Sequence, residues 1–472
     1  MTIGPIRVKL LLFAAALALI LLLAGRLWLI PARFSTDPNE GWNALQAMRA
    51  FGAGPLYPAP GGLTGNNYPP LSFYLVGLLA RLTGDAIIAG RLVASTALAV
   101  VGGCVAFAIR RFTAPGGVAP AIGALAFVAL NATLFRDYVA MNDPQWLAHA
   151  LMTVGLCVLL PTRAQDAPGA SHVVVAALAM VCGALVKHNL LALPAAATLW
   201  LLLHHRRAAA IWIGTGLVAL ALAAAACALA YGAVFFADLF AADRLYSAGR
   251  MLSQSGPFVI ATMPLLIGSV RLLRRRDADS RIDLLLLAVA FALPLGAIEE
   301  SGEGVDVNAF FEAAIALCIA GPVSLALAPA RSLVCEPVAW LLFPLMALLP
   351  GTLSIERAEF ADRTAEEAVW KTLTDRITRV HGDVACQMPA ACYWSGKTLG
   401  IDFFLYGQQV LKHHDTSALA EALRTHRFAA IELEPADDAM DGADSPDPIA
   451  PLVVHAYHPV WRDEDGRELL VP

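Results

Sequence analysis

The sequence predicts a polytopic α-helical membrane protein with about eleven transmembrane helices, followed by a small soluble α/β domain. Of its 472 residues, 58% are hydrophobic and 15% are charged. The mean hydropathy is +0.64, which is typical of chains that lie largely in a bilayer. Apolar runs close to the ~20 residues that cross a bilayer recur from residue 9 to residue 351 and then stop.

The charges divide at the same point. The last 120 residues carry 11 Lys and Arg against 21 Asp and Glu, whereas the first 352 residues carry 22 against 17. Such a balance excludes a basic nucleic-acid surface and a simple soluble enzyme. We therefore predict a transmembrane domain over 1–352, with a first outer loop and its interface helices over 31–87, and an α/β domain over 353–472.

The first predicted helix covers 10–30 and follows Arg7 and Lys9. It is too long for the core of a signal peptide, so its start is placed in the cytoplasm. The other predicted spans are 88–110, 117–135, 143–161, 172–187, 188–203, 209–231, 257–273, 282–299, 308–330 and 336–352. Because eleven is an odd number, the C-terminal domain is expected on the side opposite the N-terminus.

The apolar segment 69–83 is short and is bounded by prolines and glycines, so we assign it to the membrane interface and not to a span. This assignment places the arginine clusters on the N-terminal side, as expected for cytoplasmic loops. They comprise Arg110, Arg111, Arg163, Arg206, Arg207, Arg274, Arg275, Arg276, Arg281 and Arg331. If 69–83 crossed the membrane, these clusters would face outward.

The first outer loop is the stretch with most candidate chemistry. The tetrapeptide from Asp37 to Glu40 is expected to open a short amphipathic helix, with Asp37 or Thr36 as the N-cap and Pro38 in the first turn. Unpaired amides at a helix start stabilise a carboxylate. Asp37 taken alone is therefore as well explained by an ordinary cap as by a functional role.

A second acid, Asp143, lies in the outer loop 136–144, at the mouth of the helix that begins with Pro144. It too has a cap as its simplest explanation. Charged groups at this depth are costly unless they pair or function. Two acids from separate outer loops therefore favour a functional site.

Cations are predicted on the same face. Lys187, followed by His188, interrupts an apolar stretch long enough for two spans, which indicates a buried partner, a phosphate or a snorkelling end. Weaker candidates are Arg91, which begins the second span, and Arg244 and Arg250, which lie in a later outer loop.

The last outer loop, 299–312, is acidic and glycine-rich and runs into a helix. Asn308 and Glu312 are four residues apart, so they share one face of that helix. They either line a common cavity or pair with each other.

Motifs that are missing narrow the chemistry further. The sequence contains no P-loop, paired CxxC, HExxH or nucleophile elbow, so a nucleotide-hydrolysing pump, a zinc protease and a serine hydrolase have no motif support. The remaining chemistry is acid/base work by carboxylates that face a phosphate held by cations.

Several short motifs in this order resemble a known family. They are Asp37-Pro38-Asn39-Glu40, Asn67-Tyr68-Pro69-Pro70-Leu71, Arg91, Asn142-Asp143-Pro144, Leu185-Val186-Lys187-His188 and Asp306-Val307-Asn308-Ala309-Phe310-Phe311-Glu312. Their order and side of the membrane resemble the GT-C superfamily of polyprenyl-phosphate-dependent glycosyltransferases, above all the bacterial branches grouped with protein O-mannosyltransferases and aminoarabinose transferases (glycosyltransferase family 39-like). Many members carry adjacent acids in the first loop, whereas Asp37 and Glu40 are three apart, which leaves open which one is the base.

The resemblance implies transfer of a sugar from a polyprenyl-phosphate-linked donor to an acceptor on the outer, periplasmic face, with inversion of the anomeric carbon. Asp37 would accept the acceptor's proton, Glu40 could join either acid, and Asp143 would orient the acceptor or a cation. The departing phosphate would be stabilised by fixed cations, chosen from Lys187, Arg91, Arg244 and Arg250. The substrate cavity is expected to include Tyr68, His188, Asn308 and Glu312.

A divalent metal is an open question, because Asp37, Glu40 and Asp143 could hold one but a lysine and arginine clamp needs none. The expected partners are the lipid-linked donor, membrane lipids and an acceptor that is a glycolipid, a glycan or a protein, with no nucleic acid. An alanine-rich chain with a disulfide-permissive tail fits a bacterial inner membrane, with the N-terminus cytoplasmic and the C-terminal domain periplasmic.

Three other functional classes remain as alternatives, one of which is a catalytically silent scaffold that substitution of Asp37 would expose. A transporter or flippase of lipid-linked sugars would predict repeats with matching broken helices, but the halves 9–180 and 181–351 show no self-similarity. A polysaccharide ligase or polymerase would carry a large arginine-bearing outer loop late in the chain, whereas the large loop here is early and acidic.

The tail is predicted to be α/β. Thr364 and Glu367 form a capping-box pair at a helix start, strands are expected at 384–387 and 428–433 around a helix at 416–426, and Asp465-Gly466 predicts a hairpin between 452–461 and 467–471. Cys386 and Cys392 can form a disulfide if the tail faces an oxidising compartment, and are otherwise free thiols.

Overall fold

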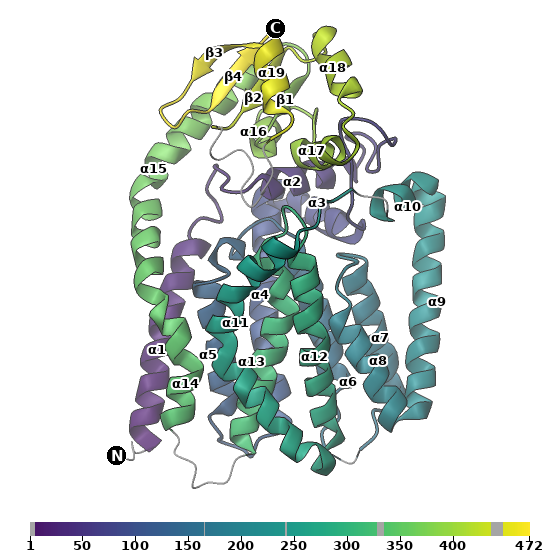
Figure 1. Cartoon of the computed structure of the whole chain (residues 1–472), viewed down its shortest axis with the longest axis vertical. Coiled ribbons are helices and arrows are strands. Elements are labelled where there is room, and N and C mark those ends of the chain that lie inside the picture. Colours follow the sequence, from purple (N-terminus) through teal and green to yellow (C-terminus); the bar gives the residue numbers. More distant parts are fainter. Residues whose placement is uncertain (1–4, 165, 241–242, 328–334, 436–446) are drawn as a thin grey trace.

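The protein is described from a computed structural model that covers residues 5–164, 166–240, 243–327, 335–435 and 447–472. A long helical bundle forms one part of the molecule, and a small sheet with flanking helices covers one end of it (Figure 1). The start of α1 (Pro5–Leu27) and the sheet lie at opposite ends of the molecule. We call the end of the bundle under the sheet the sheet-facing end.

Every predicted span overlaps a helix. Besides α1, the bundle helices are α4 (Ala86–Arg110), α5 (Ala119–Ala132), α6 (Gln145–Leu159), α7 (Ala170–Ala184), α8 (Ala192–His204), α9 (Arg206–Tyr231), α11 (Ala248–Arg271), α12 (Ser280–Glu300), α13 (Phe311–Ala326) and α14 (Cys335–Ala347). Among the described residues, five helices are long and apolar enough to cross a membrane. The chain is therefore a membrane protein. The helix α13 lies inside the helical bundle, because every residue from Phe311 to Val323 is buried.

One predicted helix start is wrong. The helix α11 begins at Ala248, and not at 257, because the side chain of Ser247 accepts a hydrogen bond from the backbone N–H of Arg250 and caps the helix. Pro257 lies inside this helix.

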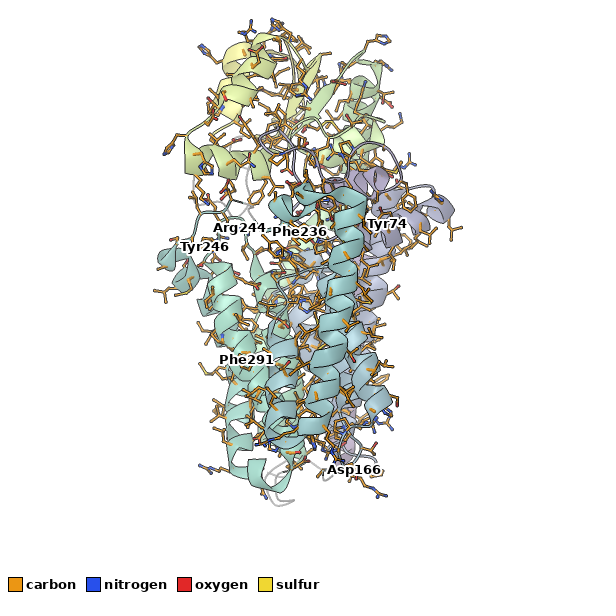
Figure 2. All side chains as sticks on the ribbon, turned by 90° about the vertical axis from the view of Figure 1, so that its right-hand side faces the viewer. Tyr74, Asp166, Phe236, Arg244, Tyr246 and Phe291 are labelled. Atoms are coloured by element: carbon orange, nitrogen blue, oxygen red, sulfur yellow. A yellow bond between two sulfur atoms is a disulfide. The ribbon has the colours of Figure 1, made fainter. Side chains whose placement is uncertain are left out.

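Several of the predicted arginine loops meet at the end of the bundle away from the sheet, and Arg331 lies outside the described residues. Arg281 donates to the backbone carbonyls of Arg111, Pro161 and Thr162 at 2.9–3.1 Å, so three loops that are far apart in sequence are joined there. Asp166 marks this end in Figure 2. The short 3₁₀ helix η2 (Leu272–Ala278) belongs to the same end.

Short helices cover the sheet-facing end. They are α2 (Pro38–Arg49), α3 (Leu71–Thr83), the 3₁₀ helix η1 (Arg136–Tyr138), α10 (Ala233–Phe240) and the 3₁₀ helix η3 (Val307–Phe310). The helix α3 occupies the segment that the sequence assigns to the interface. It ends at Gly84, whose φ of 78° is left-handed, a conformation that glycine adopts without strain.

The C-terminal part begins with a long helix, α15 (Leu349–Arg379). This helix contains the predicted boundary at 352. It also contains Thr364 and Glu367, so the predicted capping box is wrong: the helix is already formed there, and Glu367 pairs instead with Arg363 at 3.2 Å.

The sheet has the strand order β1-β2-β4-β3. Its strands are β1 (Val384–Cys386), β2 (Ala430–Leu433), β3 (His458–Arg462) and β4 (Glu468–Val471), with β1 parallel to β2 and the other two pairings antiparallel. The accompanying helices are α16 (Pro389–Trp394), α17 (Phe403–His413), α18 (Ser417–Arg424) and α19 (Ala450–Ala456). The strand predicted from 452 is wrong over its first half, because Pro451 suits the first turn of α19.

Cys386 and Cys392 form a disulfide. It joins the end of β1 to α16. This short segment packs against α2, as described below.

Candidate active site

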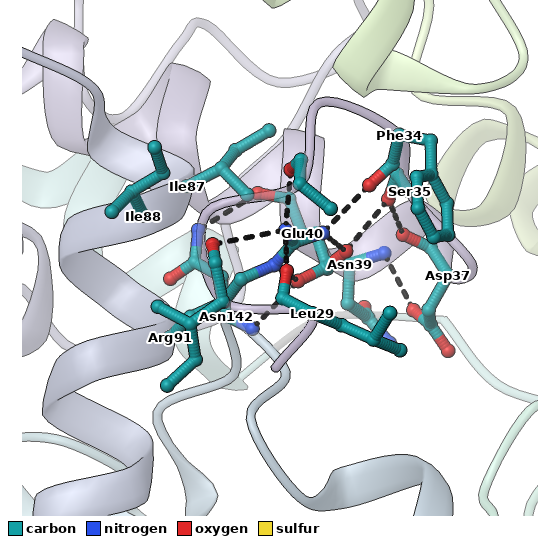
Figure 3. A network of polar contacts seen from close by, with 12 residues as sticks. Leu29, Phe34, Ser35, Asp37, Asn39, Glu40, Ile87, Ile88, Arg91 and Asn142 are labelled. Carbon is teal, nitrogen blue, oxygen red and sulfur yellow. Dashed lines mark hydrogen bonds and ion pairs between the residues drawn. The ribbon is translucent and has the colours of Figure 1, made fainter. Parts of the chain in front are cut away.

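A buried ion pair organises the sheet-facing end. Both Arg91 on α4 and Glu40 in the first turn of α2 are buried, and the two side chains form two hydrogen bonds of 2.6 Å (Figure 3). The remaining donors of Arg91 bond to the backbone carbonyls of Leu29, Ile30, Ala32 and Phe34 at 2.7–3.3 Å. Arg91 therefore fixes the start of the first loop against α4.

The second loop is tied to the same ion pair through Asn142. Its backbone N–H donates to Glu40 Oε1 at 3.1 Å, and its side-chain amide donates to the Glu40 carbonyl at 2.8 Å. The carbonyl of Asn142 accepts from Asn43 Nδ2 at 3.1 Å. A Cβ atom at Gly90 would lie 1.5 Å from Asn142 Oδ1, so this loop position requires a glycine on α4.

These contacts bring Asp143 close to Asp37. Asp37 is the N-cap of α2, and its Oδ1 accepts from the backbone N–H of Asn39 at 2.7 Å. Burial, together with the charges of Asp143, Glu40 and Asp306, raises the pKa of Asp37 to about 7, although the Asn39 bond acts in the opposite direction. A carboxylate with a pKa near neutral pH is suited to general base catalysis.

A buried cation, Lys187, also interacts with Asp143. It lies in the segment that connects α7 and α8. Asp143 Oδ1 accepts from the backbone N–H of Gln145 at 2.7 Å, and Lys187 Nζ donates to Gln145 Oε1. The ammonium nitrogen lies 5.3 Å from the ring centre of Tyr68. The charge of Asp143 acts on both Asp37 and Lys187, so the three groups belong to one site.

The side chain of Gln145 is itself held in place. Its Nε2 atom lies 3.0 Å from His149 Nε2 and donates to the carbonyl of Asn308 at 3.3 Å. The amide oxygen of Gln145 is thereby directed at Lys187. Asn308 reaches the site through its backbone.

Two predicted cavity residues contact other groups. Glu312 accepts from the backbone N–H groups of Ala192 and Leu193 at 3.1–3.2 Å and so caps α8. The predicted alternative that Glu312 pairs with Asn308 is therefore wrong, because the unpaired amides at the start of α8 bind the carboxylate. His188 lies beside Phe240, with ring centres 6.2 Å apart.

The remaining predicted cations differ in position. Arg244 lies between the bundle and the sheet (Figure 2), where its guanidinium is 5.5 Å from the ring centre of Phe404, and its charge acts on Lys187. Arg250 is buried and donates to the carbonyl of Val305. Arg244 thus belongs to the surroundings of Lys187, whereas Arg250 holds the loop before η3.

Two residues near Asp37 were not among the predicted site residues. Asp306 caps η3, raises the pKa of Asp37 and bonds to the Tyr138 side chain. Asp306 could have been found as a third acid at a helix start in an outer loop, following the same reasoning as for Asp37 and Asp143. Tyr138 has no comparable sequence signal.

The residues do not fit a metal centre. Among the described residues, no three His, Cys, Asp or Glu side chains are grouped to hold a metal ion. The oxygens of Glu40 already accept from Arg91, Ser35 and Asn142. The proposed ligand set of Asp37, Glu40 and Asp143 is therefore not available as a set.

No protein-family model matches the chain, and no curated protein sequence matches it. Solved structures do. ArnT from Cupriavidus metallidurans in the apo state is similar with a TM-score of 0.64 and 14% identity, over 98% of this chain and 97% of ArnT. The same protein bound to undecaprenyl phosphate gives a TM-score of 0.63 and 14% identity, over 99% and 98% of the two chains.

A second similar protein is the Archaeoglobus fulgidus oligosaccharyltransferase in complex with Zn and sulfate. Its TM-score is 0.51 at 12% identity, over 98% of this chain and 72% of the archaeal one. ArnT, an aminoarabinose transferase, and the archaeal enzyme both belong to the GT-C superfamily. The chain therefore shares the fold of these two proteins, which agrees with the predicted GT-C-like architecture.

Proposed function

We propose that the protein is a membrane glycosyltransferase that moves a sugar from a polyprenyl-phosphate-linked donor to an acceptor, with Asp37 as the base. The observation that carries this proposal is that Gln145 bonds to both Asp143 and the buried cation Lys187. The charge of Asp143 also acts on Asp37, whose pKa is raised to about 7. The fold shared with ArnT, which has been solved with undecaprenyl phosphate, supports a lipid phosphate as the leaving group.

The reaction that we infer is a single displacement. The acceptor oxygen or nitrogen attacks the anomeric carbon, a new bond to that carbon forms, and the bond from the carbon to the phosphate oxygen breaks. The polyprenyl phosphate leaves with the electron pair, and the acceptor's proton passes to Asp37. Attack from the side opposite the leaving group inverts the anomeric carbon.

Each cation then has a definite part. Lys187 donates to Gln145 and lies beside the Tyr68 ring. Its positive charge stabilises the negative charge that develops on the phosphate, and the charge of Arg244 adds to this stabilisation. Asp143 orients the acceptor or Lys187. Glu40 and Arg91 hold the loops in place, since their polar atoms are bonded to each other and to the chain.

We further propose that the N-terminus is cytoplasmic in a bacterial inner membrane and that the C-terminal domain, 353–472, is periplasmic. The arginine loops at the end away from the sheet and the disulfide at the other end support this orientation, because positive loops stay inside and disulfides form outside. The acceptor is then a glycolipid, a glycan or a protein of the outer face.

The proposal is tested by sugar transfer from a set of radiolabelled polyprenyl-phosphate sugars in membranes that contain the wild type or Asp37→Asn. Asparagine still caps a helix, so the variant should fold, bind donor and transfer about 10² to 10⁴-fold more slowly. The matched control is Asp85→Asn, which makes the same change at the N-cap of α4 and should retain activity.

If Asp37→Asn keeps full activity, Asp37 is not the base, and Glu40 or Asp143 takes that role in the proposal. If the wild type transfers none of the sugars, the transporter and scaffold alternatives replace the proposal.

A further inference from the structure

The C-terminal part contacts α2 at two consecutive residues, Gly41 and Trp42. A Cβ atom added to Gly41 would lie 1.9 Å from the backbone nitrogen of Ala390 on α16, so the two backbones are in direct contact. At the next position, Trp42 Nε1 donates to Asp402 Oδ2 at 2.7 Å. Both side chains of this hydrogen bond are buried. The C-terminal part therefore packs directly against α2 and also forms a buried hydrogen bond with it.

Asp402 is fixed on both sides of this bond. Its Oδ1 accepts from the backbone N–H of Leu405 at 2.9 Å and caps α17. Its own backbone N–H donates to the carbonyl of Leu63 in the first loop at 2.7 Å. The acceptor that Trp42 meets is therefore rigidly placed, and a rigid acceptor fixes the indole that donates to it.

Trp42 links this acceptor to the proposed phosphate site. Its ring meets the Tyr68 ring edge-on, with centres 5.4 Å apart and planes at 79°, and it also packs against Phe73 at 5.8 Å. Lys187 Nζ lies 5.3 Å from the centre of the same Tyr68 ring. A continuous line of contacts therefore runs from Asp402 through Trp42 and Tyr68 to Lys187.

Trp42 also belongs to the helix that carries the proposed base. Asp37 is the N-cap of α2, and Trp42 follows it by little more than one turn of the helix. A rotation of α2 that releases the indole would therefore shift Asp37 as well. Asp37 and the indole of Trp42 are therefore held by the same helix.

We propose that Trp42 is a positioning residue, locked by Asp402, through which the C-terminal part holds Asp37 and Lys187 in the geometry for transfer. This inference rests on the proposed function. Trp42 is not itself a catalytic residue, because it acts on Tyr68 and α2. Small displacements of reacting groups are sufficient to slow a displacement reaction severely.

The test uses the full-length protein in lipid vesicles and the variant Trp42→Phe, which keeps an aromatic ring and removes the N–H donor. Its matched control is Trp394→Phe. Trp394 Nε1 donates to Asp85 Oδ2 at 2.9 Å, so the control deletes a second Trp–Asp bond between the same two parts of the protein, with its acceptor at the N-cap of α4 and not on α2. We expect Trp42→Phe to lower kcat about tenfold and to raise the donor KM, with Trp394→Phe within about twofold of the wild type.

A second pair of variants separates the bond from the ring. Asp402→Asn keeps the cap of α17, because asparagine is an equally good N-cap, but weakens the acceptor. If the bond is what matters, the double variant Trp42→Phe/Asp402→Asn should be no slower than Trp42→Phe alone. The proposal would be overturned if the losses of activity in the two single variants multiplied in the double variant. It would also be overturned if Trp42→Phe and Trp394→Phe lost activity equally.

Hydrogen exchange of residues 38–49 provides a readout that does not depend on transfer. Exchange should rise in Trp42→Phe and stay unchanged in Trp394→Phe. If the wild type transfers no sugar but this difference appears, the proposed function fails and the positioning contact stands. If the wild type transfers sugar and Trp42→Phe matches it in both kcat and donor KM, the positioning role fails and the proposed function stands.

Discussion

The ion pair between Arg91 and Glu40 allows a prediction that separates a structural role from phosphate binding. Both side chains are buried, and Arg91 makes hydrogen bonds to Glu40 and to four backbone carbonyls. In Arg91→Met, the carboxylate of Glu40 loses its cation and the carbonyls lose their donor. If Arg91 is structural, the main consequence is a loss of stability.

The size of the effect follows from these contacts. Leaving one member of a buried pair uncompensated costs about 3–5 kcal/mol, and each buried carbonyl left without a donor adds about 1 kcal/mol or more. A total above about 5 kcal/mol is comparable to the whole stability of a typical domain. We therefore expect Arg91→Met to accumulate poorly in membranes and to unfold at a clearly lower temperature. Arg91→Lys should restore little, because an ammonium cannot reproduce the fork of donors.

The assay is thermal unfolding of the purified protein in detergent, followed through the reactivity of buried cysteines such as Cys157 and Cys318. Adding Glu40→Gln to Arg91→Met removes the stranded charge and should recover about 2 kcal/mol or more of the loss. The control is Arg81→Met, since Arg81 is exposed over the Phe51 ring and should change stability by less than about 0.5 kcal/mol. A stable Arg91→Met protein with weakened donor binding would refute this reasoning and restore Arg91 to the phosphate site.

Three further predictions concern the site. Transfer should rise as the pH increases through about 7, because Asp37 must be ionised to act as a base. Since its folded pKa lies above the ordinary value of 3.8, the same group should lower the free energy of unfolding as the pH rises from 4 to 7. Asp37→Asn should strongly reduce transfer at every pH and remove the contribution of Asp37 to the trend in melting measurements. Lys187→Met should weaken binding of a polyprenyl phosphate about tenfold or more in a titration, whereas Lys371→Met, at an exposed position on α15, should leave it unchanged. Gly90→Ala should lower transfer and the unfolding temperature by displacing Asn142, but Gly103→Ala on the same helix meets nothing within 4 Å and should be neutral or slightly stabilising.

The helical architecture was predictable because hydropathy alone locates membrane helices. Boundaries failed where local capping or tertiary structure decided them. Ser247 starts α11 early, and the long α15 runs through the predicted cap at Thr364. Such helix starts depend on one side-chain hydrogen bond or on continuity from the preceding turn, which hydropathy does not report.

The acids and the lysine of the site were predictable because charges near apolar segments are rare enough to notice. Their partners were not. Glu40 and Arg91 are separated by 51 residues and Trp42 and Asp402 by 360, and neither pair carries a spacing rule. Sequence reasoning therefore placed Glu40 with the catalytic acids and Arg91 with the phosphate ligands, and only the three-dimensional arrangement joins them to each other.

That pairing explains how two carboxylates in one short segment can have different roles. Glu40 is neutralised by Arg91 and bonded to both loops, so it is suited to holding structure. Asp37 faces other carboxylates, which together with burial raise its pKa to about 7 and give it a proton affinity useful near neutral pH. Surroundings that differ in this way suit one acid to a structural role and the other to acid/base catalysis. The three-residue separation of Asp37 and Glu40 thus allows Glu40 to anchor the loop while Asp37 keeps the role of base that we propose for it.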